Sequence, residues 1–70
     1  MKLKFYIDCN DDAERCGEAM NFGRPISIEG EDPFTGRTKP YKGIVLAVDK
    51  VTTETLGERW RIAIETELAH

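Results

Sequence analysis

A chain of only 70 residues has room for a single hydrophobic core. Surface grows faster than interior at this size, so such a chain buries only about 60% of the surface that its unfolded form exposes. We therefore expect one domain over residues 1–70, with marginal stability and no space for a buried cofactor. With 40% hydrophobic and 33% charged residues, the composition is typical of a folded domain and not of a disordered segment.

The net charge of −3 limits the partners that the whole molecule attracts. An acidic protein repels polyanions, so binding of nucleic acid requires a locally basic face, and the sequence contains no basic tail or run. The longest uninterrupted apolar stretch, Ile44 to Val48, is too short to span a bilayer. The first residues also lack the continuous apolar region of a secretory signal. These features predict a soluble, cytoplasmic protein with no membrane partner.

The cysteines and acidic residues do not follow the spacing of a metal site. Cys9 and Cys16 stand seven positions apart, which matches neither a redox dithiol nor a paired zinc ligand, so we expect reduced, structural thiols. Residues 8–12 carry oxygen ligands at alternate positions, as a calcium loop does, but the turn glycine is replaced by Ala13 and the last ligand by Ala19. The sequence therefore predicts no metal site and no cofactor.

The first half of the chain predicts a strand, a helix and a second strand. Apolar and polar residues alternate over 2–8, which is typical of a strand covered on one face. Asp11 followed by Glu14 forms a capping-box pattern that predicts the start of a helix, and Gly23 supplies a left-handed stop. Residues 24–29 then alternate again and predict a short edge strand.

The second half predicts a loop and a long hairpin. Residues 30–40 contain two prolines and two glycines, which favours one long loop that is mobile in the free protein. Residues 41–51 are apolar on both sides and indicate a central strand, and after a turn at 52–57 the alternation resumes over 58–69. An amphipathic helix is the alternative for 58–69, but it would point Ile62 outward.

The element order β-α-β-β-β predicts an α+β fold. We expect a largely antiparallel sheet of three or four strands, with the helix on the face that carries Leu3, Phe5, Ile62 and Ile64. The alternative is a small β-barrel with one helix, because the last three strands form a meander that could curl.

The sheet face away from the helix is the main candidate binding surface. An apolar patch within a charged rim is typical of a protein interface, so we expect a homodimer or docking to another protein. Aromatic side chains beside cations also suit single-stranded nucleic acid, which is the alternative function, although five acids on this face argue against it. The predicted partner-binding residues are Tyr6, Tyr41, Val45, Ala47, Val51, Arg59 and Arg61, and the opposing acids are Asp8, Glu29, Asp49, Glu65 and Glu67.

A second candidate site lies in and after the long loop. Arg37, Lys39 and Lys42 suit a phosphate or carboxylate, although Glu31 and Asp32 in the same segment would partly neutralise them. The sequence contains none of the common motifs of nucleophilic hydrolases, phosphate-binding loops or zinc proteases, and it holds no internal histidine. We therefore expect a non-catalytic interaction domain.

Overall fold

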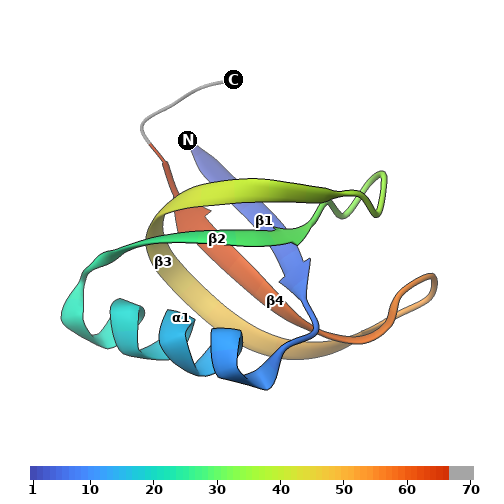
Figure 1. Cartoon of the computed structure of the whole chain (residues 1–70), viewed down its shortest axis with the longest axis horizontal. Helices are drawn as coiled ribbons and strands as arrows, with labels where there is room; N and C mark the ends of the chain where they lie inside the picture. The colour runs from blue at the N-terminus through green and yellow to red at the C-terminus, as the bar shows by residue number, and fades with distance from the viewer. Residues whose placement is uncertain (67–70) are drawn as a thin grey trace.

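The computed structural model describes residues 1–66 and contains one helix and four strands in that range. The elements are β1 (Lys2–Ile7), α1 (Asn10–Phe22), β2 (Pro25–Glu31), β3 (Thr38–Thr53) and β4 (Gly57–Glu65), as Figure 1 shows. The predicted α+β class and the predicted element order are confirmed. The last element is a strand as far as Glu65, and the predicted continuation over 67–69 lies outside the described residues.

The four strands form one antiparallel sheet that closes into a small barrel. β3 pairs with β2 and β4, β4 pairs with β1, and β1 returns to β2 through the single pair Tyr6 and Glu31. The sheet thus curls as the alternative architecture expects. α1 connects β1 to β2 and packs against β3 and β2, on the side of the molecule away from the N-terminus in Figure 1.

The buried core lies inside the barrel and under α1. The ring of Phe5 stacks on that of Tyr41, with centroids 4.2 Å apart and an angle of 9° between the planes. Cys16 of α1 is fully buried beside them, so the predicted position of the helix on the face of Phe5 and Ile62 is confirmed. The core consists of Phe5, Ile7, Ala13, Cys16, Tyr41, Val45, Ile62 and Ile64.

A β-bulge in β3 changes which side chains point inward. Val45 pairs with Ile64 and Val48 pairs with Ile62, so one extra residue, Leu46, stands between two inward positions. The strict alternation that the sequence predicts over 41–51 is therefore wrong, because the bulge shifts the register by one residue.

The helix begins two residues earlier than the capping-box pattern predicts, because that pattern makes Asp11 the N-cap. Asn10 is its first residue and Cys9 is the N-cap, which makes no side-chain capping bond. The indole Nε1 of Trp60 donates to Oδ1 of Asn10 at 2.9 Å, and this bond ties the helix start to β4. Asp11 consequently lies in the first turn, where its negative charge interacts favourably with the helix dipole and stabilises the helix. The predicted stop is confirmed, since Gly23 has a φ of 65°.

The predicted loop over 30–40 is shorter than expected. β2 continues through Glu31 and β3 begins at Thr38, so only residues 32–37 connect them. Asp32 organises this connection: its amide donates to the carbonyl of Arg37, and its Oδ1 accepts the amides of Phe34 and Thr35 at 2.8 and 3.1 Å. The strands extend further than proline and glycine content suggests because these bonds close the turn locally. The predicted mobility of the segment stays a prediction.

α1 has 13 residues, and no helix in the described part of the chain is long and apolar enough to cross a membrane.

Candidate binding site: a groove lined by lysines

Two of the predicted interface residues are buried in the core. Tyr41 and Val45 are 8% and 3% exposed, so their assignment to an exposed sheet face is wrong. The reason is that the bulge at Leu46 reverses the alternation along β3. After the bulge Val48 packs against the core, whereas before it the odd-numbered Tyr41 and Val45 face the interior of the closed sheet. Tyr6, Ala47 and Val51 remain at least partly exposed.

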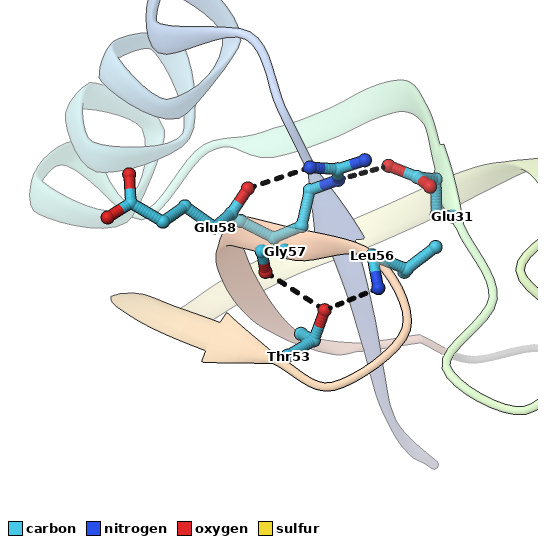
Figure 2. A network of polar contacts seen from close by, with 6 residues as sticks. Glu31, Thr53, Leu56, Gly57 and Glu58 are labelled. Atoms are coloured by element: carbon cyan, nitrogen blue, oxygen red, sulfur yellow. Dashed lines mark hydrogen bonds and ion pairs between the residues drawn. The ribbon is translucent and has the colours of Figure 1, made fainter.

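The two predicted interface arginines are held by acids of the same chain. Nε of Arg59 donates to Oε1 of Glu31 at 2.8 Å, and its Nη1 donates to the carbonyl of Glu58 (Figure 2). The side chains of Arg59 and Glu31 are only 22% and 20% exposed. Arg61 lies 3.8 Å from a carboxylate oxygen of Asp49 on β3. Arg59 is therefore held within the barrel wall, whereas Arg61 remains 42% exposed in a longer contact with Asp49.

A groove of about 690 Å³ lies between the N-terminal half of β1, the connection 32–37 and the first half of β3. We call it the lysine groove. It is bounded by four exposed lysines and by an apolar lining that includes the bulge residue of β3. The lining residues are Lys2, Leu3, Lys4, Asp32, Pro33, Phe34, Lys39, Pro40, Tyr41, Lys42, Leu46, Ala63 and Thr66.

Strand pairing explains why the lysines converge there. Lys2 and Lys4 occupy alternate positions of β1, so both project from the outer side of the barrel. Lys4 pairs with Ala63, whose small side chain leaves the groove open at that point. The second pair of lysines, Lys39 and Lys42, comes from the part of β3 that pairs with β2.

The electrostatics of the groove are positive. Nζ of Lys39 lies 3.1 Å from Oδ2 of Asp32, whereas Lys2, Lys4 and Lys42 form no salt bridge with any residue in 1–66. The amide of Phe34, together with Lys39 and the amide of Thr35, lowers the pKa of Asp32 below its usual range. Asp32 is therefore ionised at neutral pH, and it neutralises one of the four lysines.

The groove also exposes large apolar side chains. Phe34 is 96% exposed and Leu46 is 44% exposed, which is unusual for residues of this type. Burial, followed by the negative charge of Asp32, raises the pKa of the Tyr41 hydroxyl, so this group stays neutral and acts only as a polar edge of the lining.

The structure brings together two of the three residues predicted for an anion site. Lys39 and Lys42 line the groove, but Arg37 does not. Lys2 and Lys4 are not among the residues predicted for the anion site, although their alternation on the polar face of the first strand is visible in the sequence. Their distance from residue 42 along the chain hides the cluster, because only the closed sheet brings the two segments together.

Acidic side chains gather in a separate cleft of about 450 Å³ at the junction of β1, α1 and β2. Asp8, Asp12, Glu29 and Glu31 line it together with Arg59. Within residues 1–66, no group of three or more possible ligands is arranged to hold a metal ion. The four acids of this cleft thus lie apart from the four lysines of the groove.

Both cysteines are free thiols. Cys16 is fully buried, and this burial, followed by the charge of Asp12, raises the pKa of its thiol. The protonated form is therefore favoured, which fits a structural side chain in the core. Cys9 is exposed at the start of α1.

Comparison with known proteins gives no relatives: no protein-family model, no curated protein and no solved structure matches this chain.

Proposed function

We propose that this chain is a non-catalytic binding domain that takes an anionic partner into the lysine groove. The observation that carries the proposal is the convergence of four lysines on one apolar groove in a molecule whose net charge is −3. A locally basic face is the condition that an acidic protein must meet to attract an anion. The free thiols of Cys9 and Cys16 support a cytoplasmic location as part of the same proposal.

The groove combines two sources of affinity. Lys2, Lys4 and Lys42 form no salt bridge within residues 1–66, so an anionic partner gains their charge without displacing an internal salt bridge. Exposed Phe34 and Leu46 add apolar area that a partner would remove from water. Positive charge alone would attract any anion. Positive charge beside apolar surface favours a partner that has both negative charge and apolar groups.

The test compares two double variants that lower the net charge equally. Lys2→Ala/Lys42→Ala removes two groove lysines, and Arg15→Ala/Arg24→Ala removes two cations beside α1, away from the groove. Binding of fluorescent oligothymidylate and of fluorescent poly-glutamate is measured by anisotropy at low salt. We expect at least one probe to bind, and the groove variant to weaken that binding by about tenfold or more relative to the control variant.

Equal binding by both double variants would contradict the proposal, because it would place the anion elsewhere. The absence of binding by either probe at low ionic strength would also overturn it.

Self-association is the second candidate function, and Leu46 is the observation that favours it. This side chain is 44% exposed in the middle of a long strand, beside Ala63 in the groove lining. Two copies that pair at this point would bury both leucines. A dimeric native mass that becomes monomeric in Leu46→Lys would support this function, and a monomeric native mass at high micromolar concentration would exclude it.

A further inference from the structure

We infer that the anionic partner of the lysine groove is single-stranded nucleic acid, with Phe34 as the platform on which a base stacks. The inference rests on the proposed function and adds the chemical class of the partner. A groove that follows a phosphate backbone with cations and offers an aromatic ring to the bases is the common solution for binding single strands.

The backbone of the connection 32–37 holds Phe34 in a fixed position with its side chain in solvent. Its amide donates to Oδ1 of Asp32 at 2.8 Å, and Pro33 before it fixes one backbone angle. The ring is 96% exposed, so its flat faces are accessible, yet it lies at the rim of the groove. The turn therefore holds the ring of Phe34 in a position where core packing does not stabilise it. A stacked base would cover the ring.

The cations of the groove suit a phosphate backbone. All four are lysines, which attract phosphates and carboxylates alike as point charges, so the choice between these anions rests on the exposed ring of Phe34. Arg37 belongs to the same connection but does not line the groove. Lysines on two sides, from β1 and β3, can follow an extended backbone without fixing its register. An acidic peptide would satisfy the charge but would leave the ring of Phe34 without a flat partner.

The acids that argue against nucleic acid in the sequence lie elsewhere or are paired. Asp8 and Glu29 line the acidic cleft. Asp49 faces Arg61 at 3.8 Å, and Glu65 binds the N-terminal ammonium at 3.0 Å. Glu67 lies outside the described residues. Within residues 1–66, Asp32 is the one acidic side chain of the groove lining, and it is already paired with Lys39.

The experiment separates the ring from the charge. The affinities of oligothymidylate and poly-glutamate are measured for the wild type, Phe34→Leu and Phe34→Trp. We expect the oligonucleotide to bind more tightly than the peptide. We expect Phe34→Leu to weaken oligonucleotide binding by about fivefold to a hundredfold, and Phe34→Trp to retain it, because stacking needs an aromatic face. Poly-glutamate binding should be the same in all three proteins.

Salt dependence supplies the second readout. Loss of one phosphate contact in Lys2→Ala should lower the slope of log K against log salt concentration by about 0.7, the value for single strands. Because Phe34 is 96% exposed, we expect its variants to fold like the wild type, and thermal melts check this.

Two results would overturn the inference while leaving the proposed function intact: poly-glutamate that binds as tightly as oligothymidylate, or oligonucleotide binding that Phe34→Leu does not change. Failure of both probes to bind the wild type would instead remove the proposed function itself.

Discussion

Gly30 shows how closely a single residue can control the core. It is buried in β2, and a Cβ atom added there would overlap the ring of Phe5. That ring is fully buried and stacked on Tyr41, so it has no free space into which to move. The close approach of β2 to the aromatic pair therefore requires the absence of a side chain at this position.

We predict that Gly30→Ala lowers the free energy of unfolding by about 1–3 kcal/mol, the usual cost of overpacking a core. Gly17→Ala is the matched control: it lies in α1 with nothing within 4 Å of an added Cβ, so it should stabilise the protein by about 0.5–1 kcal/mol. Urea denaturation of the two variants measures both values. Equal stability of the two would show that the ring of Phe5 moves freely.

Asp32 gives the groove a dependence on pH. The amide of Phe34, then Lys39 and the amide of Thr35, lower the pKa of this carboxyl in the folded state. A lowered pKa means that the ionised form favours folding, so its contribution is present above the unfolded value of about 3.9 and is lost as the pH falls through the folded pKa.

We predict that an NMR titration of the Asp32 carboxyl carbon gives a pKa below about 3.9. The amide shifts of Phe34 and Thr35 should change with the same midpoint, because their hydrogen bonds depend on the ionised carboxylate. A midpoint at or above the unfolded value would mean that Asp32 does not hold the turn.

At the scale of the elements, the weak point of the barrel is the junction of β1 and β2. These strands share the single residue pair Tyr6 and Glu31. The ion pair of Arg59 with Glu31 links β4 to β2 at the same place, with both side chains mostly withdrawn from water (Figure 2). A partly buried pair of this kind is more effective than an exposed one, because solvent screens it less.

Removal of either partner should therefore loosen the closure. We predict that Arg59→Met and Glu31→Gln each lower the free energy of unfolding by about 1–3 kcal/mol. The first leaves the Glu31 carboxylate without its donor, and the second keeps an acceptor oxygen but removes the negative charge that strengthens the bond. The double variant should be less destabilised than the sum, and a double-mutant cycle measures the coupling. Arg61→Met is the control, because its pair with Asp49 is long and exposed and should contribute little. Additive effects at Arg59 and Glu31 would show that the pair does not support closure.

The strands differ in how well their sequences predict them. β1 and β4 keep a strict alternation that reads directly as one inward and one outward face, and the core residues Phe5, Ile62 and Ile64 follow it. β3 departs from this alternation at Leu46, and no residue type near Leu46 predicts the bulge. Because the bulge reverses the alternation, Tyr41 and Val45 face inward, whereas strict alternation predicts that they face outward.

At the scale of the whole molecule, closure of the sheet creates the candidate site. The lysine groove joins residues 2–4 to residues 32–42, which are far apart in the chain. Periodicity predicts the elements and the α+β class, but it carries no information on which strand pairs close the barrel. Part of the lysine groove is therefore predictable from Lys39 and Lys42, whereas the contribution of β1 requires the structure.

Closure also separates two groups of charges. The acidic cleft and the lysine groove occupy different parts of the barrel surface. Such a separation would orient an approaching polyanion and would make its association sensitive to salt. The central claim is therefore that an anionic partner binds in the lysine groove.

Chemical-shift mapping with oligothymidylate tests that claim most directly. Amide spectra of the labelled protein are recorded during a titration at low salt. We predict that the largest shifts occur at residues 2–4, at Phe34 and at residues 39, 41 and 42, with little change in α1 or around the acidic cleft. Shifts centred on Arg59 and Arg61, or spectra that the oligonucleotide leaves unchanged, would contradict the account.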